Sequence, residues 1–321
     1  LNGEITMTLR EKAKNAVSSH VMVLVCVAFL LIGAILSPNY LTVKNLTTIM
    51  RAWSITGVVA IGQCFVIISG GIDASLNGML SCLVVFYATV DRFPFPVAVL
   101  LTILLGALFG TISGAIVAKF NIAPFIITMG MGTICEGISY LISSGKALFP
   151  QRNVETLRWI GSERLLGIPV MVYLFLIIVI IGQLLLSKTS LGLSFRAVGG
   201  NNDAAYFCGL KTKRIKIWAH VICGITCALG AVLTVARTNA ADPVIGEGVM
   251  LDSLAIAVLG GTYMGGNGMG NIWGVLVGAF ILGSVKNLLT LMEISSYWQY
   301  VVTGVIVIAA VVAGSVSIKK K

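Results

Sequence analysis

Charged side chains are scarce in this chain. They make up 11% of its 321 residues, whereas an ordinary soluble domain carries about 25%. This shortage excludes a water-soluble domain, and a hydrophobic share of 57% with a mean hydropathy of +0.99 indicates an integral membrane protein. We expect a single transmembrane domain, residues 19–316, between a short cytoplasmic amino-terminal segment, 1–18, and a basic cytoplasmic tail, 317–321.

Patterns of catalytic and metal-binding residues are missing as well. The chain has only two histidines, His20 and His220, and its seven cysteines include no Cys-x-x-Cys pair. The glycine-rich stretch 260–270 is not followed by the Lys-Ser/Thr pair of a phosphate-binding loop. We therefore predict no catalytic residue, no metal site and no cofactor in this chain, and free thiols packed in a helix bundle.

Long uncharged runs are present instead, and they predict about ten membrane-spanning helices. The expected spans are His20–Leu36, Ala52–Ser69, Ser75–Val90, the stretch between Arg92 and Lys119, Asn121–Ser143, Pro169–Ser187, Ile217–Ala236, two spans within Ser253–Val285, and Tyr297–Val316. The predicted fold class is an all-α polytopic membrane protein. A weak similarity between residues 106–125 and 278–297 suggests an inverted repeat, although glycine- and alanine-rich helices also resemble each other by chance.

The basic residues indicate how these spans are oriented. The net charge of +10 comes from short loops between apolar runs, which is the topology signal of membrane proteins and argues against nucleic-acid binding. With the amino end inside the cell, thirteen Lys and Arg residues lie in cytoplasmic segments and eight in outer ones. We therefore expect both termini and the loop 188–216 to be cytoplasmic.

The loop 188–216 is the longest polar segment of the chain, and its middle predicts a short helix, 199–210. The evidence is an N-cap, an acidic first turn and a terminal glycine: Asn201 or Asn202, Asp203, and Gly209. So short a helix is marginal in water and must dock on something. Two small and two aromatic residues suit a docking surface: Ala204, Ala205, Tyr206 and Phe207. A solvated loop that joins two membrane helices is the alternative.

Two glycine-rich breaks, Gly70–Ser75 and Gly260–Gly270, suggest a pathway through the protein. Irregular backbone is tolerated in a membrane only where it is buried in protein or lines a wet cavity. Tight packing of small residues is the competing explanation, and Asp73 can either cap the next span or line the pathway. The candidate pathway residues are Gly70, Gly71, Asp73, Ser75, Asn77, Glu136, Gly260, Gly261, Thr262 and Lys286.

Glu136 and Lys286 are the two ionisable residues that fall within predicted spans. Each lies roughly 22 Å along an outward-running helix, at 1.5 Å per residue. Because an isolated charge at that depth is costly, we predict that the two interact. The alternative is that Lys286 extends to the interface while Glu136 is protonated or solvated separately.

The link between two predicted spans, residues 237–252, offers polar side chains at the outer mouth: Asn239, Asp242, Glu247 and Asp252. Acceptors of this kind suit a polyhydroxylated ligand or the basic residues of a docking protein. A plain solvated loop has the same composition.

Five motifs together resemble the permease subunits of ribose-type ABC importers, whose members carry ribose, arabinose, xylose, galactose or autoinducer-2. They are Gly70–Ser75, Gly199–Ala205, Gly246–Asp252, Leu259–Thr262 and Ser295–Gln299, and the resemblance covers all ten predicted spans. The sequence departs from the family's pattern at four places: Asn77, the turn Gly265–Gly270, Glu136 and Lys286.

The resemblance implies a bacterial cytoplasmic-membrane permease that imports a monosaccharide or a related small polar solute. It implies a second permease subunit, a homodimer being favoured, an ABC ATPase that binds Mg-ATP, and an extracytoplasmic sugar-binding protein. The ATPase would engage Gly199, Gly200, Asn201, Asn202, Asp203, Ala204, Ala205, Tyr206, Phe207 and Gly209. A secondary transporter or channel is the alternative; it would need ion-binding carboxylates at the membrane midplane, where the sequence suggests none. A membrane enzyme lacks its catalytic residues here.

Overall fold

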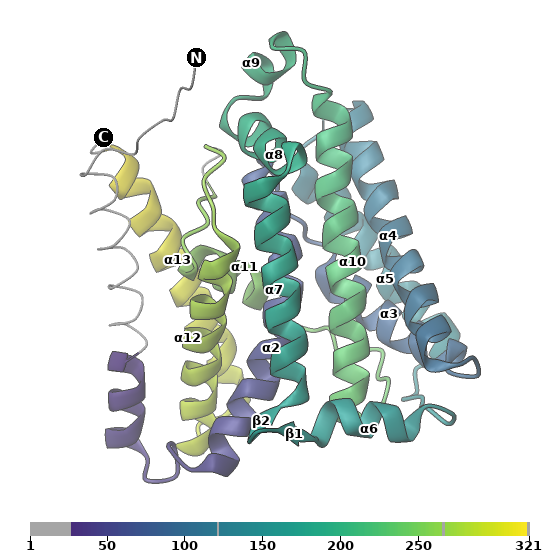
Figure 1. Cartoon of the computed structure of the whole chain (residues 1–321), viewed down its shortest axis with the longest axis vertical. Coiled ribbons are helices and arrows are strands. Elements are labelled where there is room, and N and C mark those ends of the chain that lie inside the picture. The colour runs from purple at the N-terminus through teal and green to yellow at the C-terminus, as the bar shows by residue number, and fades with distance from the viewer. Residues whose placement is uncertain (1–26, 121, 265–266, 320–321) are drawn as a thin grey trace.

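The computed structural model describes residues 27–120, 122–264 and 267–319. Most of them are helical (Figure 1), and a helix over Val27–Leu36 comes first. The elements that follow are α2 (Val43–Ile68), α3 (Leu76–Val90), α4 (Phe95–Phe120), α5 (Pro124–Ser143), α6 (Val154–Ser162), β1 (Arg164–Leu165), β2 (Ile168–Pro169), α7 (Val170–Lys188), α8 (Ser190–Gly200), α9 (Asn202–Phe207), α10 (Thr212–Thr238), α11 (Val249–Leu259), α12 (Ile272–Leu291) and α13 (Ser296–Lys319).

Six of the described helices are long and apolar enough to cross a membrane: α2, α4, α5, α7, α10 and α12. The sheet in the described part of the chain is a single antiparallel hairpin, in which Arg164 pairs with Pro169 and Leu165 with Ile168. The chain is therefore a multi-pass membrane protein, and the expected all-α class is confirmed.

Helices α2 and α10 form the centre of the bundle. In their most apolar stretches 72% and 83% of the residues are buried, against 28% in α4 and α5, which lie at the periphery. Small residues let the central helices approach their neighbours closely. A Cβ added at Gly106 of α4 would lie 2.4 Å from the carbonyl oxygen of Gly224 in α10, and one added at Gly224 would lie 2.0 Å from that of Gly106. Part of the high glycine content is thus explained by helix packing.

Helices α3 and α11 start beside each other and run in opposite directions. The N–H of Met250 donates to Oδ1 of Asn77 at 2.7 Å, and the N–H of Gly246 donates to Oγ of Ser81 at 3.0 Å. These two hydrogen bonds join antiparallel segments. With 15 and 11 residues, or about 22 and 16 Å, neither helix is long enough for a hydrocarbon core of about 30 Å.

The far ends of these two short helices lie at opposite ends of the bundle. Asp91, which follows α3, accepts the N–H groups of Gln151 and Arg152 just before α6. Gly260, which follows α11, packs on Gly274 in the first turn of α12. Figure 1 shows α6 with the hairpin at one end of the bundle and α8 with α9 at the other; we name these the α6 end and the α9 end. Together α3 and α11 therefore resemble one membrane helix broken in its middle.

Several boundaries differ from the sequence-based expectation. Helix α2 begins at Val43 rather than Ala52, because Oγ1 of Thr42 accepts the N–H of Asn45 and caps it. The polar stretch 144–167 contains α6 and the first strand of the hairpin. Residues 190–200 of the predicted loop form a separate helix, α8. Helix α13 runs to Lys319, into the predicted tail, whereas residues 1–18 and the first part of the His20–Leu36 span lie outside the described residues.

Candidate functional site

The short helix predicted at 199–210 is present as α9, but only over Asn202–Phe207, since Gly199 and Gly200 end α8; its caps are as expected. Oδ1 of Asn201 accepts the N–H groups of Asp203 at 3.1 Å and of Ala204 at 2.9 Å. Gly209 ends the turn with a φ of +85°, a conformation that favours glycine. Between the two caps α9 has only six residues, so its stability depends on packing.

The exposed surface of α9 is aromatic. The side chains of Tyr206 and Phe207 are 65% and 85% exposed, and their rings meet edge to face with centroids 5.9 Å apart. Ala204 is also exposed. Ala205 differs from the expectation: it is only 5% exposed and belongs to the chain's own core, so it anchors α9 to the bundle.

The break between α2 and α3 is buried in its second half, residues 73–75, whereas Gly70 is exposed and Gly71 partly so. Asp73 is fully buried; one of its carboxylate oxygens accepts the N–H of Ser75 at 2.9 Å and its hydroxyl at 2.5 Å, and the other has no hydrogen-bond partner. Gly70, with a φ of +90°, lies against the Cα of Gly199 at the end of α8. Gly71 packs on Pro124. This break therefore connects α8 to the start of α3, and Asp73 bonds locally to Ser75, while α3 itself has no side-chain cap.

The second break, after α11, is also closely packed. A Cβ added at Gly260 would lie 2.5 Å from backbone atoms of Gly274, and Gly261 has a φ of +84°. Thr262 is 1% exposed, and its hydroxyl lies 2.6 Å from Sγ of Cys64. Of the stretch 260–270, residues 265 and 266 lie outside the described residues. The described part of this break is therefore a packed joint.

Three of the candidate pathway and mouth residues line one polar cavity of about 300 Å³, which we name the glutamate cavity. It lies where α3 and α11 start, against α5, and its walls are Asn77, Gly78, Ser81, Glu136, Tyr140, Pro243, Val244 and Glu247. No basic side chain is among them. Two other outer-link residues have local roles instead: Oδ1 of Asp242 accepts the N–H of Val244, and Asn239 ends α10 with a φ of +52°.

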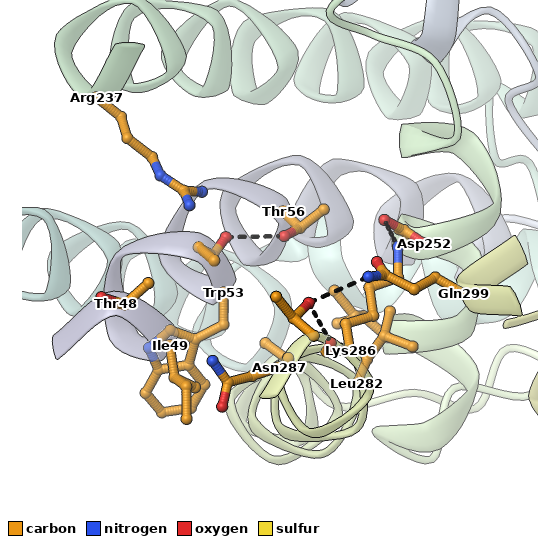
Figure 2. A pocket seen from close by; sticks show the side chains of 15 residues that line it. Thr48, Ile49, Trp53, Thr56, Arg237, Asp252, Leu282, Lys286, Asn287 and Gln299 are labelled. Atoms are coloured by element: carbon orange, nitrogen blue, oxygen red, sulfur yellow. Dashed lines mark hydrogen bonds and ion pairs between the residues drawn. The ribbon is translucent and has the colours of Figure 1, made fainter. Parts of the chain in front are cut away.

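A second cavity of about 290 Å³, which we name the lysine cavity, lies between α2, α10, α11, α12 and α13 (Figure 2). Nζ of Lys286 donates to both carboxylate oxygens of Asp252, at 2.6 and 2.5 Å. The two side chains are 29% and 15% exposed. The remaining polar walls are hydroxyls, amides, an indole and a guanidinium: Thr48, Thr56, Thr290, Asn287, Gln299, Trp53 and Arg237.

The predicted pairing of Glu136 with Lys286 is wrong. Lys286 forms its ion pair with Asp252, whereas the exposed Glu136 lines the other cavity. The depth of Lys286 along its helix follows from the rise per residue, but depth does not determine the direction in which a side chain points around the helix axis. Helix α11 supplies the carboxylate of Asp252, which is the partner of Lys286 in place of Glu136. The sequence did not predict a short helix at this position inside the bundle.

The sequence pattern did not indicate Trp53, Asn287 or Gln299 as site residues. A signal was present in α2, where Asn45, Thr48, Ala52 and Thr56 recur at intervals of three and four residues and therefore share one face. The side-chain amides of Asn45 and Asn287 bond reciprocally at 2.9 and 2.8 Å, joining α2 to α12. Among the residues that the structure describes, no group of His, Cys, Asp and Glu is placed to hold a metal ion.

A family model described as "Branched-chain amino acid transport system / permease component" matches residues 45–311. The chain is 35% identical over 280 residues to the ribose import permease protein RbsC of Escherichia coli (strain K12), covering 86% of this chain and 87% of that protein. It is 34% identical over 283 residues to the D-allose transport system permease protein AlsC of the same strain, with 86% and 85% covered.

A third relative is the L-arabinose transport system permease protein AraH of Escherichia coli (strain K12), which is 34% identical over 299 residues, with 91% of this chain and 88% of that protein covered. No solved structure matches the chain significantly.

Proposed function

Because the chain belongs to the family of branched-chain amino acid transport system permease components, we propose that it is the membrane-spanning subunit of an ATP-driven importer. The solute class is supported by the relatives, which are named for ribose, D-allose and L-arabinose and match most of this chain at 34–35% identity. We accordingly propose a monosaccharide, or a related small polar solute, as the transported molecule.

The observation that carries the transport proposal is the pair of short helices, α3 and α11, whose starts meet beside the glutamate cavity. In membrane proteins, backbone that is interrupted inside the bundle is tolerated where it is buried or lines a wet cavity. Transporters use such broken helices to place polar backbone and side chains at a solute site. In the proposed function, Asn77, Glu136 and Glu247 line the pathway at this point.

We propose that the α9 end is cytoplasmic, because the basic residues are concentrated in the segments expected there. In this orientation both chain ends are cytoplasmic, ten helices form one domain over residues 19–316, and an inverted repeat relates its halves. The outer link that carries Asn239, Asp242, Glu247 and Asp252 then faces an extracytoplasmic binding protein. A second copy of the chain completes the permease in the membrane of a bacterial cell.

A partner ATPase, which binds and hydrolyses Mg-ATP, is proposed to dock on α9. Tyr206 and Phe207 offer the aromatic area that interface hot spots favour. Movement of α9 would pass through α8 to Gly199, which touches Gly70, and from there to the 70–75 link and α3. The residues proposed to take part in this coupling are Gly199, Gly200, Asn201, Asn202, Asp203, Ala204, Ala205, Tyr206, Phe207 and Gly209.

A secondary transporter remains a second candidate because the bundle contains buried carboxylates. The sequence suggests no ion-binding carboxylate at the membrane midplane, but Asp73 is fully buried and the side chain of Asp252 is 15% exposed. Buried carboxylates are what an ion-coupled transporter requires. The paired state of Asp252 and the local hydrogen bonds that Asp73 accepts from Ser75 favour the ATP-driven importer.

The test is to purify the chain with the ATPase that it retains and to reconstitute the complex in liposomes. Uptake of labelled ribose, allose and arabinose is then measured with ATP and a binding protein, and separately with a proton or sodium gradient alone. We expect uptake and sugar-stimulated ATP hydrolysis only with ATP. Uptake driven by an ion gradient without the ATPase would overturn the proposal in favour of a secondary transporter.

A further inference from the structure

The position of the Asp252–Lys286 pair requires an explanation. Lys286 lies 14 residues into α12, or about 21 Å from its start, and only part of its side chain is exposed. Removing an ion pair from water costs several kcal/mol per ion, and an apolar pair of similar size is often as stable or more so. The negative charge of Asp252 is stabilised by its place in the first turn of α11, where the helix dipole is positive. Lys286 has no comparable structural reason to be there.

The pair forms part of the wall of a cavity that fits a small molecule. Its volume of about 290 Å³ is near the lower end of the range for ligand pockets. The amide of Asn287 is paired with Asn45 and the amide nitrogen of Gln299 donates to Thr290, whereas Nε1 of Trp53 is buried with no hydrogen-bond partner. Donors and acceptors thus surround one space, which is the arrangement that fixes the orientation of a hydroxylated ligand.

The charge of the cavity limits what it can accept. In Figure 2 Lys286 and Asp252 point toward each other, while Arg237 reaches toward α2 from α10. Arg237 also lines the cavity, and Figure 2 draws it apart from the pair; the residue as a whole is exposed, although burial partly desolvates its guanidinium. An anionic ligand would compete with Asp252 for Lys286 and leave a buried carboxylate unpaired, and a cationic ligand would do the reverse. An uncharged ligand can accept a hydrogen bond from Lys286 and donate one to Asp252 while the two charges still neutralise each other.

We propose that the lysine cavity is a solute-binding site within a single permease chain, and that it takes an uncharged polyhydroxylated molecule. This rests on the proposed function and adds to it a site and a charge class. The glutamate cavity suits this class less well, because its two carboxylates have no basic residue beside them in the lining. The ion pair is the central recognition element, and the amide oxygen of Gln299 and Nε1 of Trp53 contact the remaining hydroxyls, while the amide of Asn287 stays paired with Asn45.

A steric test uses two threonines in similar local settings. The hydroxyl of Thr56 in α2 donates to the carbonyl of Ala52, and that of Thr111 in α4 donates to the carbonyl of Ala107. Thr56 lines the cavity, whereas Thr111 is exposed on a peripheral helix. We expect Thr56→Trp to fill the cavity and lower ATP-driven uptake at least about tenfold, a difference of 1.4 kcal/mol, and Thr111→Trp to leave it unchanged. Thr290→Trp, from the exposed rim of the cavity, serves if Thr56→Trp does not fold.

An electrostatic test uses the neutral sugar with the highest uptake, its aldonic acid and its amino derivative. The complex should take up the neutral sugar at least about tenfold faster than either charged form. Asp252→Asn and Lys286→Met should each lower uptake more than the double variant does, because each single change leaves one buried charge unpaired.

Wild-type uptake in both cavity-filling variants, or preference for a charged form, would overturn the site and its charge class while the permease proposal stands. Absence of ATP-driven uptake of every sugar by the wild-type complex would instead refute the proposed function.

Discussion

Replacing Gly199 with alanine tests how the two ends of the proposed coupling route are joined. Gly199 is the penultimate residue of α8, and its Cα touches Gly70 in the link before α3. A Cβ at this position would lie 1.8 Å from the carbonyl oxygen of Ile68, 2.8 Å from its carbonyl carbon and 3.2 Å from the nitrogen of Gly70. Because all three are backbone atoms, no side-chain rotation can relieve the overlap.

The expected magnitude follows from that geometry. An ordinary contact of 3.4 Å requires the end of α8 and the end of α2 to separate by about 1.6 Å. Overpacking of this kind costs about 1–3 kcal/mol, and the better helix propensity of alanine offsets at most about 1 kcal/mol. Because the 1.8 Å overlap is with backbone, the cost lies at the upper end, about 2–3 kcal/mol, and the net loss is about 1–2 kcal/mol. This lowers the melting temperature of a chain of this size by roughly 2–6 °C.

Gly200→Ala is the matched control, one residue further along the same helix. The nearest atom to its added Cβ lies 3.7 Å away, an ordinary contact, so the stability should stay within about 0.5 kcal/mol of wild type. Thermal unfolding in detergent measures the stability of both variants. Uptake and ATP hydrolysis are then measured in the reconstituted complex, to show whether the shift of α8 uncouples uptake from hydrolysis. For Gly199→Ala we expect hydrolysis to continue and uptake to fall about tenfold. A Gly199→Ala protein with wild-type melting and uptake would refute the reasoning.

Two further predictions concern the two ends of the bundle. The double variant Tyr206→Ala with Phe207→Ala should keep the wild-type melting temperature, because both side chains are largely exposed. It should weaken ATPase binding by about 2 kcal/mol or more. Retention of the ATPase at wild-type affinity would contradict docking on α9. Asp242→Lys with Glu247→Lys should raise the binding-protein concentration needed for half-maximal ATP hydrolysis while hydrolysis without binding protein persists, since Glu247 is exposed and Asp242 partly so. An unchanged concentration dependence would assign these residues to a passive loop.

Local features of the chain were predictable from the sequence because local rules govern them. Apolar runs of sufficient length predicted helices within a few residues of α3, α5 and α7, since each must satisfy its own backbone in a membrane. The cap at Asn201 and the stop at Gly209 were equally readable, because a side-chain oxygen and a positive φ act on neighbouring residues only. The five motifs that resembled the sugar permeases agree with the family found by comparison.

The tertiary structure alone decided which of these residues meet. The rise of 1.5 Å per residue gives the depth of Lys286, but its partner depends on rotation about the helix axis and on α11, which enters the bundle from residues read as an outer link. The burial of Ala205 and the meeting of α3 with α11 likewise come from packing between segments far apart in the chain. Two helices of the same depth and composition can face different neighbours, because close packing of the whole bundle, and not local sequence, determines their orientation.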